Sequence, residues 1–298
     1  MNKNILLELS LIGCNIKQNE PLSKHTTLCI GGNADYFVEI FNEQQLILLL
    51  KVIYKNKIKF YIIGGGSNIL FSDEGFRGII IKLCGDFCRY CIQENKIVCG
   101  SAVNLSFLSK ITADKELSGL EYFVGIPGTV GGAIYGNAGT KNMSISSVID
   151  KLEIVDFIGI KKILNKKDFN FEYRKSNLQN CVITKAFFVL KKTDKNDILK
   201  VILQETDKRR KTQPIGTKNA GCIFKNPKND SAGRIIDSLN LKNYSIGDVK
   251  VSNIHANFII NENNGSARDM LNLIDFIKNE VKKKYGISLE TEIKIIKW

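Results

Sequence analysis

Two dense clusters of glycine constrain this chain more than any other feature of its sequence. The first, Gly64-Gly65-Gly66-Ser67-Asn68, comes directly after the β-rich residues 60–63, so a strand leads into a run of small residues. With no large side chains in the way, the backbone N–H groups of such a run can approach a phosphate closely. An ordinary tight turn between two strands would also accommodate these residues.

Two familiar phosphate-binding motifs do not fit this first cluster. A Walker A loop ends in Gly-Lys-Ser or Gly-Lys-Thr, and that ending is absent. A Rossmann fingerprint needs glycine where Ile69 stands, and the next expected strand begins about ten residues later, too soon for a crossover helix. We therefore expect this loop to join one strand to another.

The second cluster is denser, because residues 125–139 contain six glycines. Backbone with so few side chains can lie against a flat, extended ligand and donate N–H hydrogen bonds to its edge. Two such loops suit a dinucleotide cofactor with a planar ring at one end. Glycine-rich folding turns that bind no ligand are the alternative.

Length and composition indicate a globular chain. Its 298 residues, 44% hydrophobic and 24% charged, are enough for about two domains with buried cores. The net charge of +13 attracts anions such as phosphates, nucleotides or nucleic acid without choosing among them. The sequence has no run of ~18 apolar residues, so we expect no membrane span.

Eight cysteines would form disulfides only in an oxidising compartment. Leu11-Ile12-Gly13-Cys14 resembles a lipoprotein cleavage box, but the apolar stretch before it is short and carries Glu8, which is poor for a signal peptide. We therefore expect a cytoplasmic protein with reduced thiols.

Hydrophobic periodicity predicts a mixture of helices and strands. Helices are expected over residues 42–55, 105–116, 197–210 and 231–239, followed by a long helix from Ser266 with a Ser266–Asp269 capping box and Gly286 at its end. Strands are expected within residues 24–40 and over 60–63, 79–83, 96–99, 152–157, 182–190, 220–225, 255–260 and 289–296. A basic stretch before Pro214 marks a domain boundary near residue 205.

The sequence resembles a known family, the UDP-N-acetylenolpyruvoylglucosamine reductases (MurB) of bacterial peptidoglycan synthesis. The resemblance covers nearly the whole chain, and its motifs occur in the family's order. They lie within residues 25–32, 63–70, 119–139, 173–176, 208–214, 220–227, 255–258 and 289–292.

The resemblance implies an α+β fold in three parts. Residues 1–82 and 83–204 would form a two-subdomain FAD-binding fold of the vanillyl-alcohol-oxidase (PCMH) type, and residues 205–298 a C-terminal α+β substrate-binding domain. The last third lacks an inserted tyrosine-bearing loop, so the chain looks like the family's shorter class.

The resemblance also implies the reaction. NADPH reduces FAD, and the flavin then passes hydride to UDP-N-acetylglucosamine enolpyruvate, giving UDP-N-acetylmuramate. We expect a monomer that acts on this small molecule, with no metal and no nucleic-acid or membrane partner.

Three residues are expected to carry the chemistry. Hydride addition places negative charge on the substrate carboxylate, so a fixed cation beside it lowers the barrier. By motif, Arg174 is the family's active-site arginine, whose planar fork can bind a carboxylate through two hydrogen bonds. Glu292 matches the family's catalytic glutamate. Glu290 would share its strand face, so the residues alone do not separate the two.

Cys222 departs from the pattern, because many members of the family carry serine there as the acid that protonates the neighbouring carbon. A thiol with a pKa of about 8.5 is mostly protonated at pH 7 and donates more readily than an alcohol. Cys222 is therefore the expected proton donor. A buried structural cysteine is the alternative.

Further residues are expected to bind the ligands. Tyr173, Arg210, Lys225 and Asn226 are the predicted substrate-binding residues. His255 is interpreted as a packing or capping residue. The predicted FAD-binding residues are Gly64, Gly65, Gly66, Ser67, Asn68, Gly125, Ile126, Pro127, Gly128, Thr129, Gly132, Ala133, Asn137, Ala138 and Gly139.

Two other interpretations remain open. Cys84, Cys88 and Cys91 have the Cys-x3-Cys-x2-Cys spacing that holds a [4Fe–4S] cluster in radical SAM enzymes, although they follow a strand in a β-rich region. The charge of +13 and the basic run at residues 208–211 would suit a nucleic-acid-binding protein, although no recognised nucleic-acid-binding signature accompanies them.

Overall fold

The structure, a computed structural model, describes residues 3–140 and 142–297. Its contacts divide the chain into two compact units. Unit 1 consists of Met1–Gln18, Tyr36–Gly65 and Gly78–Asp207, and unit 2 of Asn19–Asp35, Gly66–Arg77 and Lys208–Trp298. The three-part division at residues 83 and 205 stays a prediction.

The larger sheet of unit 1 has five antiparallel strands. Their order is β10 (Lys161–Asn165), β9 (Ile149–Asp156), β13 (Cys181–Val189), β7 (Lys96–Gly100) and β6 (Tyr90–Gln93). Its buried side chains, among them Ile154 and Phe188, share an apolar cluster with Leu105 and Leu108 of helix α3 (Leu105–Asp114). This burial holds α3 to the sheet.

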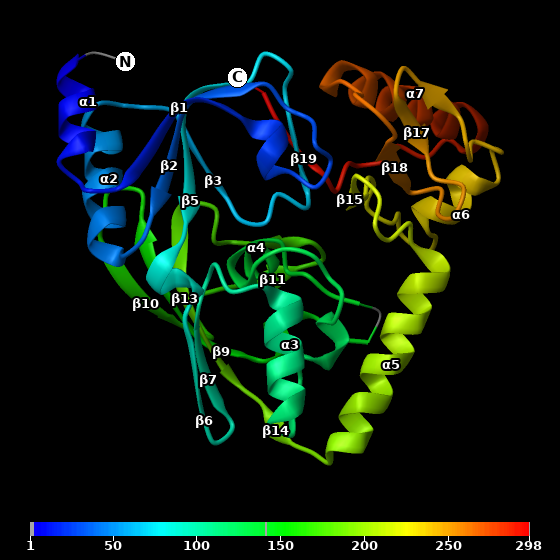
Figure 1. Ribbon diagram of the computed structural model, residues 1–298. Helices are drawn as coiled ribbons and strands as arrows, with labels where there is room; N and C mark the ends of the chain where they lie inside the picture. Colours follow the sequence, from blue (N-terminus) through cyan, green and yellow to red (C-terminus); the bar gives the residue numbers. More distant parts are fainter. Residues whose placement is uncertain (1–2, 141, 298) are drawn as a thin grey trace. The chain divides into compact units, whose positions relative to one another are not determined.

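A second sheet, most of whose residues belong to unit 1, has the order β1 (Asn15–Pro21), β2 (Asn33–Ile40), β5 (Phe76–Leu83) and β3 (Phe60–Ile63). Helix α2 (Glu43–Lys55) buries Leu46, Leu49, Leu50 and Ile53, the face that its periodicity predicts. Asn42 begins α2 by accepting a hydrogen bond from the Gln45 N–H. In Figure 1, α1 (Lys3–Ser10) lies beside α2, in agreement with their contacts.

The remaining elements of unit 1 lie outside these two sheets. They are α4 (Val130–Tyr135), α5 (Lys195–Thr212, which continues into unit 2), the 3-10 turns η2 (Gly85–Cys88), η3 (Glu121–Phe123) and η4 (Ile145–Ser147), and the strand pairs β8 (Leu117–Ser118) with β14 (Lys191–Lys192) and β11 (Phe171–Glu172) with β12 (Lys175–Ser176).

Unit 2 is built on a four-stranded sheet with the order β15 (Asn219–Cys222), β18 (Phe258–Asn261), β17 (Val249–Val251) and β16 (Ser245–Ile246). Helices α6 (Ala232–Asp237) and α7 (Ala267–Tyr285) pack with it (Figure 1). The unit also contains η1 (Leu22–His25) and the parallel pair β4 (Ile69–Phe71) and β19 (Lys294–Ile296).

Helix α7 supports the core of unit 2. Met270, Ile274, Ile277 and Val281 on its inner face are buried, as the sequence predicts. The expected capping box between Ser266 and Asp269 is confirmed, and Gly286 ends the helix in the left-handed conformation with φ +68°.

Three expected elements differ from the structure. The glycine-dense segment after residue 125 contains helix α4, which begins where the Thr129 side chain accepts a hydrogen bond from the Gly132 N–H. The strand expected over residues 220–225 ends at Cys222, after a bulge. Of the strand expected over residues 289–296, only Lys294–Ile296 is regular.

No helix in the described part of the chain combines the length and the apolar character needed to cross a bilayer.

His255 has the packing role expected from the sequence. Its ring lies 4.9 Å from that of Phe258, and its Nδ1 accepts a hydrogen bond from the Asn257 N–H at 3.1 Å. A Cβ at Gly233 would come within 2.8 Å of the imidazole Cε1, so helix α6 packs directly against the ring. Burial, together with the nearby Lys242, lowers the pKa of His255 below its usual value.

This pKa shift predicts a pH dependence of stability. Because the folded state holds His255 with a lowered pKa, the unfolded state binds more protons below about pH 6.5, and the free energy of unfolding falls as the pH decreases from there. Urea unfolding of the wild type and of His255→Gln across this range measures the effect. We expect a weaker dependence in the variant, and an equal dependence would contradict this explanation.

Candidate active site

The first glycine cluster joins one strand to another, as the sequence predicts, but the second strand is β4, which begins directly after the cluster and was not expected. Two carbonyl groups tie the loop to its neighbours. The Gly66 carbonyl oxygen accepts a hydrogen bond from the Thr27 N–H at 3.1 Å, and the Asn68 carbonyl oxygen accepts one from the Lys294 N–H at 3.0 Å. A Cβ at Gly66 would lie only 1.9 Å from the His25 carbonyl oxygen, so the loop closes against residues 25–27.

The two glycine clusters pack against each other within unit 1. A Cβ on Gly64 would come within 2.7 Å of the Thr129 Oγ1, and a Cβ on Gly65 within 2.8 Å of the Gly128 Cα. Real Cβ atoms do not approach other atoms so closely, so both positions require glycine for packing. Part of the glycine content therefore brings two loops together.

Several N–H groups of the second cluster bond within the protein. The Gly131 N–H donates to the Ser101 carbonyl oxygen at 2.7 Å, and the Gly136 N–H donates to the Gly132 carbonyl oxygen at 3.1 Å. The Gly125 N–H donates to the Ser106 Oγ at 2.8 Å. Fewer N–H groups are thus available to a ligand than the sequence suggests.

Two buried polar groups lie at this cluster, in Asn137 and Ser101. Asn137 and Ser101 are 8% and 4% exposed. The Asn137 Oδ1 and the Ser101 Oγ have no hydrogen-bond partner within residues 3–140 and 142–297. Buried polar atoms are normally paired, so a bound group with hydrogen-bond donors would complete these sites. Ser101 was not among the predicted site residues, since no motif marks it.

Arg174 lies in the two-residue turn between β11 and β12. Its backbone is left-handed, with φ +57°, which is uncommon for a residue other than glycine. Its guanidinium carbon lies 5.1 Å from the centre of the Tyr173 ring, within the range of a cation–π contact. Arg174 is half-buried and Tyr173 is exposed.

Cys222 and Glu292 belong to neighbouring segments of unit 2. The Ile223 carbonyl oxygen accepts a hydrogen bond from the Glu292 N–H at 2.8 Å. Phe224 and Thr291 form an antiparallel bridge at the same place. The Asn68 side chain donates to the Glu292 carbonyl oxygen at 3.3 Å. Unit 2 therefore brings together predicted residues from three distant parts of the sequence.

A bulge precedes Cys222. Asn219 pairs with Ile260 and Cys222 with Phe258, so β15 has one more residue than its partner. Gly221, with φ +73°, takes up the extra length, and its N–H donates to the Asn219 Oδ1 at 2.9 Å. Bulges turn a side chain away from the direction a regular strand would give it. The bulge thus sets the direction of Cys222.

The two competing glutamates have different surroundings. Residues 290–292 form a single bridge and no regular strand, so the predicted shared strand is wrong. The Glu290 side chain is 74% exposed, and its Oε2 pairs with the Lys225 Nζ at 3.0 Å. The Glu292 side chain is half-buried. Glu290 thus forms an exposed ion pair with Lys225, and the choice of Glu292 as the site residue stays a prediction from the family motif.

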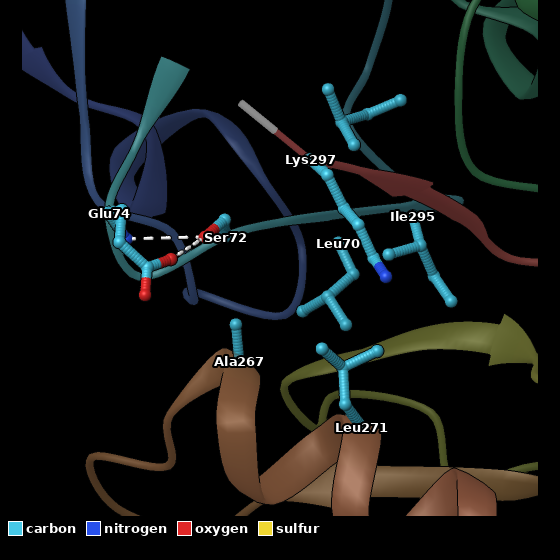
Figure 2. A pocket seen from close by; sticks show the side chains of 8 residues that line it. Leu70, Ser72, Glu74, Ala267, Leu271, Ile295 and Lys297 are labelled. Atoms are coloured by element: carbon cyan, nitrogen blue, oxygen red, sulfur yellow. Dashed lines mark hydrogen bonds between the residues drawn. The ribbon is translucent and has the colours of Figure 1, made fainter. Parts of the chain in front are cut away.

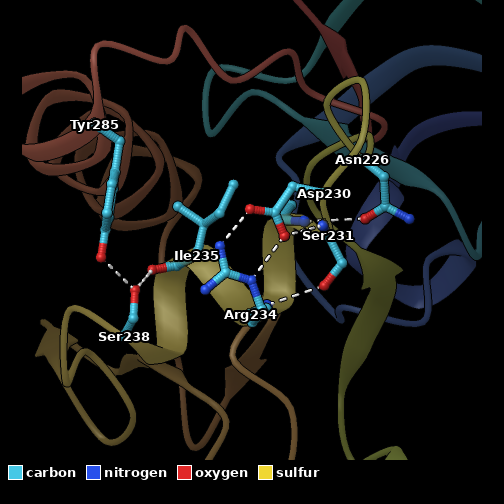
Figure 3. A network of polar contacts seen from close by, with 8 residues as sticks. Asn226, Asp230, Ser231, Arg234, Ile235, Ser238 and Tyr285 are labelled. Carbon is cyan, nitrogen blue, oxygen red and sulfur yellow. Dashed lines mark hydrogen bonds and ion pairs between the residues drawn. The ribbon is translucent and has the colours of Figure 1, made fainter.

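The predicted substrate-binding residues have varied surroundings. Lys225 makes the ion pair with Glu290. The Asn226 side chain accepts a hydrogen bond from the Ala232 N–H at 3.0 Å and points to the start of α6 (Figure 3). Arg210 is exposed near the end of α5. Their roles toward substrate, and that of Tyr173, stay predictions.

A separate pocket of about 360 Å³ lies in unit 2 (Figure 2). Its apolar walls come from Leu70 of β4, Leu271 of α7 and Ile295 of β19, and Ser72 and Glu74 lie at its edge. None of the predicted site residues lines it.

The three clustered cysteines give no support to an iron–sulfur centre. Cys84 is half-buried, which raises its pKa, whereas Cys88 and Cys91 are exposed. The described residues contain no group of three or more His, Cys, Asp or Glu side chains arranged to hold a metal ion.

Comparison with known families identifies the parts of the chain. Residues 34–160 match the FAD binding domain family. Residues 213–296 match the family of the UDP-N-acetylenolpyruvoylglucosamine reductase C-terminal domain. The reductase of that name from Bacillus licheniformis is 39% identical, with 94% of each chain covered, and that from Bacillus subtilis is 38% identical, with 93% covered.

The chain belongs to the UDP-N-acetylenolpyruvoylglucosamine reductase family. The crystal structure of the MurB reductase from Thermus caldophilus superimposes with a TM-score of 0.82 and 31% identity, over 95% of this chain and 98% of that one. The expected α+β fold, with an FAD-binding part and a MurB C-terminal domain, is confirmed. Neither the iron–sulfur nor the nucleic-acid interpretation is supported.

Gly65→Ala tests whether the packed glycine loops hold FAD. The new Cβ would push residues 64–66 away from Gly128, so we expect the purified variant to retain less than about a tenth of the wild-type flavin. Gly136→Ala is the matched control, because its Cβ would meet nothing nearer than 3.5 Å. Flavin absorbance per protein chain measures both, and equal retention by the two variants would contradict the role of loop packing.

Proposed function

We propose that this protein reduces UDP-N-acetylglucosamine enolpyruvate to UDP-N-acetylmuramate with NADPH as reductant, in the synthesis of peptidoglycan precursors. The observation that carries the proposal is the similarity to UDP-N-acetylenolpyruvoylglucosamine reductases over more than nine-tenths of their length. When bound, FAD accepts hydride from NADPH and supplies it to the enolpyruvyl group.

The FAD site is assigned to the two packed glycine loops. Gly64–Asn68 and the residues around Gly128 supply backbone that approaches without side chains, and Asn137 and Ser101 add buried acceptors. These features suit a ligand with phosphate groups and with ring N–H donors.

Arg174 and Glu292 act on the substrate carboxylate in this proposal. The carboxylate gains negative charge as the enolpyruvyl group is reduced, and the Arg174 guanidinium binds it through two hydrogen bonds. Stacking of Arg174 on Tyr173 limits the orientations of the guanidinium before substrate arrives. Glu292 holds a proton or an ordered water against the same carboxylate.

Cys222 donates the proton. The S–H bond breaks, and its proton bonds to the carbon next to the carboxylate, so that carbon completes its four bonds. The thiolate left behind regains a proton from solvent. The bulge at Gly221 supports this assignment, because it gives the side chain a direction that a regular strand would not.

The activity is tested on the purified protein. We expect a flavin absorption band that NADPH bleaches under anaerobic conditions and that UDP-N-acetylglucosamine enolpyruvate restores. A colourless protein that remains inert to both compounds after FAD is added would overturn the proposed function.

Measuring flavin reduction and flavin reoxidation separately distinguishes proton donation by Cys222 from a purely structural role. We expect Cys222→Ala to keep NADPH-driven flavin reduction and to slow flavin reoxidation by the substrate at least about 100-fold, the usual contribution of a general acid. Cys222→Ser should retain much of both. Cys14→Ala is the control, because Cys14 is another half-buried thiol and lies in unit 1.

Stopped-flow absorbance measures both steps. Unimpaired reoxidation in Cys222→Ala would remove Cys222 from the chemistry and leave the rest of the proposed function intact.

A further inference from the structure

We propose that Ser176 is a positioning residue that holds Arg174 in place through helix α4. This inference rests on the role proposed above for Arg174. Ser176 lies two residues beyond the arginine, on the second strand of the β11–β12 hairpin. It was not among the predicted catalytic or binding residues.

The turn that carries Arg174 needs external support. Its hairpin has only two residue pairs, Phe171 with Ser176 and Glu172 with Lys175. A pair of such short strands is not stable alone. In addition, the left-handed backbone of Arg174 is unfavourable for a residue with a Cβ, and such a conformation persists only where the surroundings enforce it.

Ser176 supplies one of the supports. Its side chain is buried, with the residue 3% exposed. Its Oγ donates a hydrogen bond to the Tyr135 carbonyl oxygen at 2.8 Å, at the last residue of α4. Without the hydroxyl, this strand would lose its side-chain bond to the helix.

The other strand of the hairpin is tied to the same helix end. The Asn137 side chain donates to the Glu172 carbonyl oxygen at 2.9 Å. Both strands are thus attached to residues 135–137, one on each side of Tyr173 and Arg174. These two hydrogen bonds therefore hold the backbone of Tyr173 and Arg174 against residues 135–137, a segment that contains predicted FAD-binding residues.

This arrangement gives Ser176 a specific part in the proposed reaction. A long arginine side chain on a free hairpin would sample many positions, and binding a carboxylate through two hydrogen bonds requires a fixed one. The Ser176 hydroxyl keeps the base of Arg174 at a set place relative to α4. Its loss should therefore affect the step that uses Arg174 and spare the step that does not.

The test compares Ser176→Ala with Ser176→Thr in the FAD-loaded protein. We expect Ser176→Ala to slow flavin reoxidation by UDP-N-acetylglucosamine enolpyruvate about tenfold, the effect of losing one hydrogen bond. Flavin content and the rate of reduction by NADPH should stay within about twofold of wild type. Ser176→Thr keeps a hydroxyl and should restore most of the reoxidation rate.

Ser109→Ala is the matched control. Ser109 is also fully buried in unit 1, and its Oγ donates to the Leu105 carbonyl oxygen at 3.0 Å within α3. It has no bond to the hairpin, so both half-reactions should keep their wild-type rates. Equal slowing in Ser109→Ala and Ser176→Ala would overturn the inference.

A second measurement tests whether Ser176 acts through the arginine. In an Arg174→Ala background, adding Ser176→Ala should not slow reoxidation further, because the group it positions is gone. Additive slowing would overturn the inference. So would equal slowing of both half-reactions, or the same defect in Ser176→Thr.

The two proposals fail in different ways. If Arg174→Ala leaves reoxidation unchanged, the role proposed for Arg174 is wrong, and the inference about Ser176 falls with it. If Arg174→Ala slows reoxidation and Ser176→Ala does not, only the inference is wrong.

Discussion

The contact between the two glycine clusters is the constraint on which unit 1 depends. Gly65 and Gly128 approach so closely that a Cβ on Gly65 would lie 2.8 Å from the Gly128 Cα. The Gly128 carbonyl oxygen also accepts the Leu105 N–H at 3.1 Å, where α3 begins, and Thr129 begins α4. The end of β3 and the starts of α3 and α4 therefore meet at one place. Helix α4 in turn contacts the hairpin that carries Arg174.

Much of the fold follows from local sequence patterns. Helices α2 and α7 match their predicted faces, because the apolar spacing and the capping residues agree at both. Helix α4 was missed, because Gly131 and Gly132 argue against a helix and only the Thr129 cap and contact with Ser101 favour it. The expected strand before Lys294 was too long, because alternation of apolar residues does not reveal that residues 290–292 meet the segment after β15 in only a single bridge, Phe224 with Thr291.

Some residues of the candidate site could likewise be predicted from the sequence, and others could not. Motifs could nominate Arg174, Cys222 and Glu292, since each stands in a distinctive run of residues. They could not find Ser101, whose significance arises only when burial leaves its hydroxyl without a partner in the described part of the chain. The motif also selects Glu292 over Glu290, whereas the ion pair of Glu290 with Lys225 could not be predicted, because it joins residues far apart in sequence.

The three proposed catalytic residues share one structural property, since each stands on irregular backbone. Arg174 is left-handed in a turn, Cys222 follows a bulge, and Glu292 lies beside a single bridge. Regular strands fix the direction of each side chain by alternation, whereas irregular segments can aim one residue independently of its neighbours. Such segments satisfy fewer of their own polar groups, so other parts of the chain must do so. Asn137, Asn219 and Asn68 perform that task in the segments that carry Arg174, Cys222 and Glu292. A site built in this way requires its supporting polar residues as much as its reactive ones.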